Sequence, residues 1–364
     1  MQKWKKILLA FLLLGLGAKS LIIQVQAANF EATVTEIVDE KVTVPAGGEP
    51  QTVQTLQLKA TSGELKGQDF QLVNGNLPLV NKQKYEVGDK LVIYQEEGTQ
   101  NFTIADVVRR PSLGWLLLIF VIAAVIVGRW QGVTSLLGLL ASFVVIFYLV
   151  VPRIAAGANP VVMVIIGCSL IIPVMFLLSH GWNRMTLVAM VATLIAMLLT
   201  ALLIVYFVNQ ALLTGMASEE AGFLAAMKPG LIDLRLLLIA GMLFATLGVL
   251  DDVTVSQAAV VQELQQTDPD LGFWQLYARA SKIGRDHISS MINTLILVYA
   301  GASFPLLLLF HDSSEPLGQV LNYEMIAEEL VRTLTGSIGL IVAVPLTTFL
   351  ACVVAVWWPV KPEN

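Results

Sequence analysis

The chain has 364 residues, of which 56% are hydrophobic and 13% charged, and its mean hydropathy is +0.75. This composition indicates an integral membrane protein, and the net charge of −5 argues against nucleic-acid binding. Cys168 and Cys352 lie in apolar segments and the histidines are scattered. We therefore expect no disulfide, metal site or cofactor.

The first predicted segment, residues 1–27, has lysines at its start and then the apolar run Ile7–Ala18. The tripeptide Val25-Gln26-Ala27 resembles a signal-peptidase cleavage site. Two interpretations remain open, a cleaved signal peptide and a retained signal anchor that forms the first transmembrane helix. We favour retention, because a multispan protein can use its first helix as the signal.

Residues 28–110 differ completely in character. Short runs rich in β-branched and aromatic residues alternate with turn clusters such as Pro45–Pro50 and Asn74–Asn76. Short strands at near-regular spacing predict an all-β domain, OB-like or SH3-like in length. No basic patch with interleaved aromatic residues accompanies them, so we do not expect oligonucleotide binding.

Residues 111–364 form the predicted helical membrane domain. Segments of span length are separated by short loops such as Arg129-Trp130-Gln131. The segment 209–230 is an interfacial helix candidate, and 268–287 contains an amphipathic run. The sequence predicts a polytopic α-helical membrane protein of about 7–8 spans, the expected spans after the first being 112–128, 132–151, 160–179, 185–208, 236–261, 289–310 and 334–358.

The basic residues predict the orientation of these spans. With the N-terminus inside, most lysines and arginines fall on the cytoplasmic side, whereas the outer segment 311–332 is acidic. This bias follows the positive-inside rule of a bacterial plasma-membrane protein. It places the β domain outside the cytoplasm and the C-terminus inside.

The strongest functional signal is the pair Asp251-Asp252 inside the apolar stretch Leu236–Val261. In a membrane-spanning helix these carboxylates lie near mid-membrane, where a charge is costly and usually functional. The alternative is that the helix ends at Leu250 and the pair caps it in a solvated loop. Intramembrane proteolysis is disfavoured, because neighbouring aspartates on a helix diverge and cannot share one site.

A helical wheel predicts the direction in which each carboxylate points. Asp251 points away from Asp252, towards a more apolar side. Because small residues let membrane helices approach closely, we expect Asp252 to face the bundle interior. The line of small and polar residues that contains Asp252 consists of Gly241, Ala245, Gly248, Asp252, Ser256, Ala259 and Glu263.

Other polar residues are secondary candidates. Asn293 and Ser289 share a helix face and either hydrogen-bond a carboxylate or serve as ordinary polar contacts between helices. Asp286 and His287 precede the same span and form either a cytoplasmic proton entry or an interfacial ion cluster. The predicted ion-coupling residues are Asp251, Asp252, Ser256, Glu263 and Asn293, with Asp286 and His287 secondary.

Three segments of the last third resemble the YibE/F family of multispan bacterial membrane proteins. They occur in family order: GVLDDVTVSQAAVVQEL at 248–264, GRDHISSMINTLILVYAGASFPLLLLF at 284–310 and EELVRTLTGSIGLIVAVPLTT at 328–348. The layout of a β domain followed by a membrane domain also fits. The resemblance implies this architecture and does not name a substrate.

A weaker likeness of pattern links the chain to resistance-nodulation-division transporters and to the SecD/SecF translocation components. They too carry an acidic residue or pair on a mid-bundle helix, here Gly248–Asp252, followed by an amphipathic helix and spans containing proline. The likeness implies that the pair binds and releases protons or sodium. The chain departs from it in size, in lacking large paired outer domains, and in lacking a lysine in another span.

The sequence therefore favours a proton- or sodium-coupled transporter or exporter. The alternative is a non-transporting scaffold or accessory subunit whose outer β domain binds a partner protein. An enzyme is disfavoured, because no catalytic motif is present. The expected partners are the lipid bilayer and either a second YibE/F-like subunit or further copies of the chain.

Overall fold

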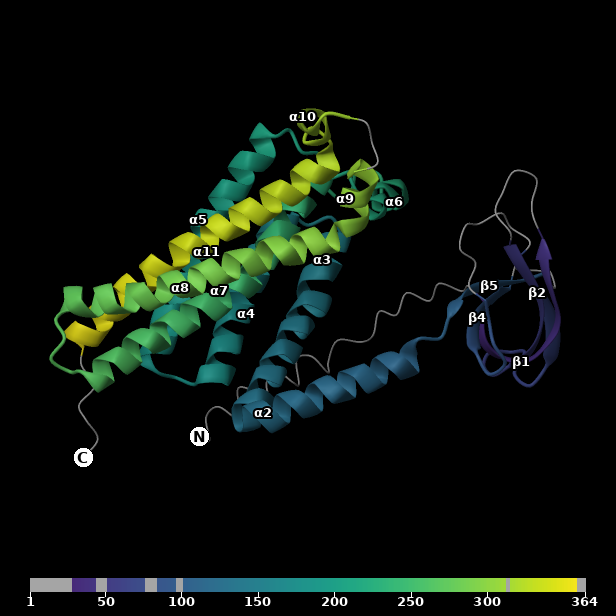
Figure 1. Ribbon diagram of the computed structural model, residues 1–364, viewed down its shortest axis with the longest axis horizontal. Helices are drawn as coiled ribbons and strands as arrows, with labels where there is room; N and C mark the ends of the chain where they lie inside the picture. The colour runs from purple at the N-terminus through teal and green to yellow at the C-terminus, as the bar shows by residue number, and fades with distance from the viewer. Residues whose placement is uncertain (1–27, 44–50, 76–83, 96–100, 312–314, 359–364) are drawn as a thin grey trace. The chain divides into compact units, whose positions relative to one another are not determined.

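The computed structural model describes residues 28–43, 51–75, 84–95, 101–311 and 315–358 (Figure 1). The segment 1–27, expected to be a signal anchor or first span, lies outside the described residues. The chain divides into an N-terminal unit that extends to Ala123 and a helical unit that follows from Ala124.

The N-terminal unit is a five-stranded antiparallel sheet, as the sequence predicts. The strands are β1 (Ala28–Thr43), β2 (Gln51–Ala60), β3 (Asp69–Asn74), β4 (Lys90–Gln95) and β5 (Phe102–Val107). Their order in the sheet is β3-β2-β1-β4-β5. The long strand β1 pairs with β4 through its first residues and with β2 through the remainder, so β1 forms the centre of the sheet.

The sheet is strongly curled. The pairing of β1 with β2 shifts register on either side of Glu36, and such irregularities bend a strand. Phe70 of the edge strand β3 and Phe102 of the edge strand β5 approach each other with ring centroids 4.7 Å apart, and Phe30 contacts both rings. Alternate residues along the strands fill the inside of the curl, among them Leu56 and Ile93.

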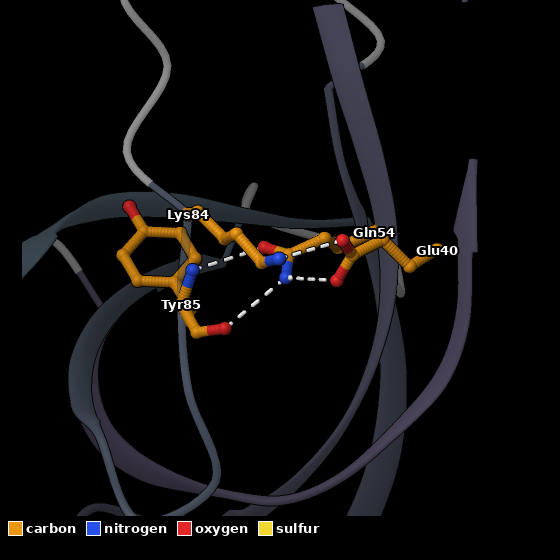
Figure 2. Close-up of polar contacts among 4 residues, drawn as sticks. All are labelled: Glu40, Gln54, Lys84 and Tyr85. Atoms are coloured by element: carbon orange, nitrogen blue, oxygen red, sulfur yellow. Dashed lines mark hydrogen bonds and ion pairs between the residues drawn. The ribbon is translucent and has the colours of Figure 1, made fainter. Parts of the chain in front are cut away.

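A buried glutamine fixes the chain that precedes β4 (Figure 2). Gln54 is fully buried; its amide donates to the carbonyl of Tyr85 at 3.1 Å and accepts from the Tyr85 N–H at 2.9 Å. The amide also contacts Glu40, which accepts a hydrogen bond from Lys84 at 2.7 Å. The Lys84 hydrogen bond lowers the pKa of Glu40, and burial raises the pKa of Tyr85.

The first helix of the structure, α2 (Arg110–Val145), is interrupted at Arg129, which has φ 49° and ψ −129°. This break falls in the loop that the sequence predicts at Arg129–Gln131. The turn is tight, because a Cβ on Gly132 would clash with the carbonyl oxygen of Ala124. The chain continues through a π-helical turn, η1 (Ile146–Val150), and α3 (Val151–Ala155).

The next helices begin where polar side chains cap them. Asn159 precedes α4 (Pro160–His180) and Asn183 precedes α5 (Arg184–Gln210), and each side chain accepts a backbone N–H of the first turn. Ser218 and Asp233 do the same in front of α6 (Glu219–Met227) and α7 (Leu234–Thr267). Helix α6 lies within the segment 209–230, for which the sequence suggests an interfacial helix, and it is too short to span a membrane.

The amphipathic run after residue 268 is not a separate helix. It forms the first half of α8 (Phe273–Ala302), which continues without a break into the predicted span and then bends by 70° into α9 (Phe304–His311). The chain ends with α10 (Leu317–Val320) and α11 (Glu324–Trp357).

The core of the helical unit lies among α5, α7 and α11, which contact one another along much of their lengths. Helix α4 packs on α7, and α8 packs on both α7 and α11 (Figure 1). Among the described residues, five helical runs are long and apolar enough to cross a membrane, and the bent pair α8–α9 would be a sixth. The count of about 7–8 spans stays a prediction.

Candidate functional site

The aspartate pair lies inside a continuous helix. Helix α7 runs from Leu234 to Thr267 without a break, so Asp251 and Asp252 are both helical. The alternative in which the helix ends at Leu250 and the pair caps it in a loop is therefore wrong. The prediction that Asp251 and Asp252 lie within an uninterrupted helix is confirmed.

Contacts with α5 fix the depth of the pair in the bundle. The hydroxyls of Thr193 and Thr254 are 2.6 Å apart, and near the start of α7 the Arg235 guanidinium lies 3.5 Å from the carbonyl of Val208. The two helices therefore run antiparallel. Asp251, one turn before Thr254, is level with the midpoint of α5, about 20 Å from either end at about 1.5 Å per residue.

The directions of the two carboxylates are opposite to the prediction. Asp252 is exposed on the outer side of the helical unit, whereas Asp251 is half-buried. The packed side of α7 is lined by large apolar and polar residues, and the line of small residues lies on the opposite side. The buried residues of α7 are Ile239, Ala240, Met242, Leu243, Thr246, Leu247, Leu250, Val253, Thr254, Gln257, Ala258 and Val261.

Asp251 lies on the side of α7 that faces α4. Phe244 is two turns earlier on that side, and its ring comes within 3.6 Å of where a Cβ on Gly167 of α4 would lie. The Asp251 backbone carbonyl accepts a hydrogen bond from the Thr254 hydroxyl at 3.2 Å. In the part of the chain that the structure describes, neither aspartate side chain has a cationic partner.

The structure separates the remaining predicted residues. Ser256 is half-buried and Glu263 is exposed, both on the outer side with Asp252. Asn293 and Asp286 are exposed on α8, and His287 is half-buried there. No hydrogen bond joins these α8 residues to the aspartates among the described residues, so the proposed contact between Asn293 and a carboxylate stays a prediction.

The sequence interpretation missed a buried polar contact that joins three helices. Gln257 of α7 is 1% exposed, and its amide donates to the Thr348 hydroxyl of α11 at 2.7 Å and to the Ala280 carbonyl of α8 at 3.1 Å. It packs where a Cβ on Gly284 would stand. The sequence signal for this contact was an amide side chain in an apolar helix, two turns after the aspartates. The contact holds α7, α8 and α11 together at this depth.

Comparison with known proteins identifies a family for this chain. A family model described as YibE/F-like protein matches residues 116–356, about two thirds of the chain. The chain belongs to the YibE/F-like family. The match begins inside α2, ends one residue before the end of α11 and includes the aspartate pair. No curated protein and no solved structure matches this YibE/F-like chain.

Proposed function

We propose that this YibE/F-like protein is a membrane transporter or exporter coupled to protons or sodium, with Asp251 as its principal ion-binding carboxylate. One observation carries the proposal. Asp251 lies at mid-depth of a bundle of apolar helices, half-buried, and has no cationic partner among the described residues. The role is non-enzymatic and requires no cofactor.

The energetics favour a carboxylate that takes up a cation. A charged aspartate at the centre of a membrane helix costs about 2.5–3.5 kcal/mol on insertion scales, and Asp252 adds a second negative charge beside it. Binding a proton or Na⁺ removes part of this cost, and release restores it. The Asp251 carbonyl and the Thr254 hydroxyl supply further oxygen atoms of the kind that Na⁺ prefers.

The architecture is compatible with movement around this position. Helix α4 contains Pro173, and α11 contains Pro345. A proline removes one backbone hydrogen bond and bends a helix at that point. A proline in each of two helices that contact α7 provides a candidate hinge point near the depth of the pair.

The topology belongs to the same proposal. The bias of basic residues supports a bacterial plasma-membrane location, with the β unit outside the cytoplasm and the C-terminus inside. The curled sheet, in which β1 is central and the edge strands approach each other, favours the OB-like over the SH3-like alternative.

The second candidate function is an accessory subunit whose β unit binds a partner protein. The observation that favours it is the separate N-terminal unit, which has its own hydrophobic core. In this case the aspartates would maintain contacts between subunits and would not carry ions.

Ion flux into vesicles tests the first candidate against the second. The purified protein is reconstituted, a pH or sodium gradient is imposed, and flux is followed with a dye inside the vesicles. We expect Asp251→Asn to abolish flux and Asp252→Asn to reduce it less. Asp270→Asn, in the loop between α7 and α8, is the matched control and should have no effect.

A thermal melt of each variant separates loss of coupling from loss of fold. Removing a charge at mid-membrane should leave the melting temperature of Asp251→Asn unchanged or raise it. Undiminished flux in Asp251→Asn would refute the role of this carboxylate. Absence of gradient-driven flux in the well-folded wild type would favour the accessory-subunit function.

A further inference from the structure

The outer side of α8 is polar along the first two thirds of the helix. Its packed side, formed by Leu276, Ala280, Gly284 and Leu295, faces α7 and α11. The opposite side carries an exposed row at helical spacing, which consists of Lys282, Arg285, Asp286, Ser289 and Asn293.

The Gln257 contacts give the depth of this row. Gln257 of α7 contacts both Ala280 and Gly284 of α8. Along the bundle axis, Gln257 is therefore level with Lys282, which is midway between those two residues. The helices are antiparallel, since only the short segment 268–272 joins them. Asp252 therefore lies at the depth of His287, and Arg285 is about 3 Å from that depth at about 1.5 Å per residue.

This depth is inside the bundle's apolar region. The neighbouring α5 carries no charged side chain between Leu187 and Val208 and lies at the same level. Around a single copy, the charged row of α8 and the exposed Asp252 would face lipid. Ionisable side chains within membrane segments almost always face a bundle interior or a water-filled space, so lipid alone is an unfavourable surrounding for this side.

The two outer sides are complementary in charge. That of α7 carries the acidic Asp252 and Glu263, and that of α8 carries the basic Lys282 and Arg285 beside one acidic residue, Asp286, so the two sides are opposite in net charge. Measured along the bundle axis, Lys282 and Arg285 of α8 lie at depths between those of Asp252 and Glu263 of α7. A two-fold axis parallel to the bundle leaves the depth of every residue unchanged. It places the acidic side of α7 of one copy against the basic side of α8 of the other copy, so the surface is self-complementary.

We propose that the outer sides of α7 and α8 form an interface with a second copy of this chain. Helix α7 of each copy packs on α8 of the other, and Arg285 of the second copy lies against Asp252. The exposed small residues Gly241 and Gly248 allow the close approach that membrane helices need. The interface forms whether or not the aspartates carry ions, so it does not depend on the proposed function.

Disulfide cross-linking in native membranes tests the interface directly. Two differently tagged copies are co-expressed with Cys168 and Cys352 replaced by alanine, one carrying Gly248→Cys and the other Ser289→Cys. These positions differ in depth by about 3 Å. On oxidation we expect a dimer that contains both tags. The control pairs Gly248→Cys with Leu198→Cys, which is exposed at similar depth on α5.

A second variant distinguishes the interface from the fold. A Cβ on Gly248 would meet no atom within 4 Å in a single copy, so Gly248→Ile should leave the melting temperature of the monomer unchanged or, through its higher helix propensity, raise it. We expect it to reduce co-purification of the two tagged copies at least tenfold, and Arg285→Gln to reduce co-purification in the same direction.

Three results would overturn the proposal. One is cross-linking no stronger than that of the α5 control pair. Another is co-purification that Gly248→Ile and Arg285→Gln leave unchanged. The third is a different protein cross-linked through Gly248→Cys in place of a second copy. None of these readouts uses ion flux, so failure of the interface and failure of the transport function are distinguishable.

Discussion

Substitution of Gly339 by alanine tests a close approach between α5 and α11. A Cβ at Gly339 would lie 3.1 Å from Cγ2 and 3.2 Å from Cβ of Thr200, with the Thr200 hydroxyl closer still. The hydroxyl donates to the Ala196 carbonyl at 2.8 Å, so the side chain is held in place. Overpacking of this kind costs about 1–3 kcal/mol.

The control is Gly301→Ala in α8, where a Cβ meets no atom within 4 Å. Both variants replace a helical glycine and gain helix propensity, up to about 1 kcal/mol, so a lower stability of Gly339→Ala reports the contact with Thr200. We expect Gly339→Ala to be less stable than Gly301→Ala by about 1–3 kcal/mol in unfolding titrations in mixed micelles.

A second substitution, at Thr200, should relieve the overpacking. Thr200→Ala removes both the hydroxyl and Cγ2, so the double variant should recover about 1 kcal/mol or more relative to Gly339→Ala alone. If Gly339→Ala matches Gly301→Ala in stability, or if Thr200→Ala gives no recovery, the two helices do not approach each other as described.

The remaining predictions concern the β unit and the topology. Residues 28–110 expressed alone should fold cooperatively, and Gln54→Ala should destabilise them by about 2–4 kcal/mol, because it leaves the buried N–H and carbonyl of Tyr85 without partners; equal melting temperatures would contradict this. Lys84 lowers the pKa of Glu40, so the stabilisation that Glu40 adds should be present at neutral pH and disappear as pH falls through that lowered pKa; a stability difference between wild type and Glu40→Gln that does not shrink on acidification would exclude it. Cysteines at Lys66 and Asp270 should label from opposite sides of the membrane, whereas labelling from one side would contradict the positive-inside orientation.

Much of the fold could be predicted from local patterns. Short runs rich in β-branched and aromatic residues predicted an all-β unit over residues 28–110, where β1 to β5 lie, and uninterrupted apolar runs placed α4 and α5 within two residues. The order of strands and the contact between Phe70 and Phe102 could not be predicted, because they depend on residues distant in sequence. The continuity of α8 was also missed, since its polar first half resembled a surface helix.

The depth of the aspartate pair could be predicted, and its orientation could not. Apolar arms of similar length on either side of Asp251 and Asp252 placed them at mid-helix, in agreement with the register that Thr193 and Thr254 set. A helical wheel shows which residues share a side of α7. It does not show which side is packed, because lipid chains and a protein interior are equally apolar.

The two sides of α7 pose different physical problems. The side with Leu250 and Gln257 is filled by α5, α8 and α11, so the large residues there already have partners in one copy. The side with Gly248 and Asp252 has small residues and a carboxylate but no such partner among the described residues. Small residues contribute to stability in a membrane only where a second helix approaches them, and a carboxylate is tolerated only where charge or water meets it. A second copy that presents α8 with Lys282 and Arg285 at this depth would satisfy both requirements. The expectation that the small-residue side of α7, with Asp252, faces a protein interior would then hold for the dimer and not for the single chain.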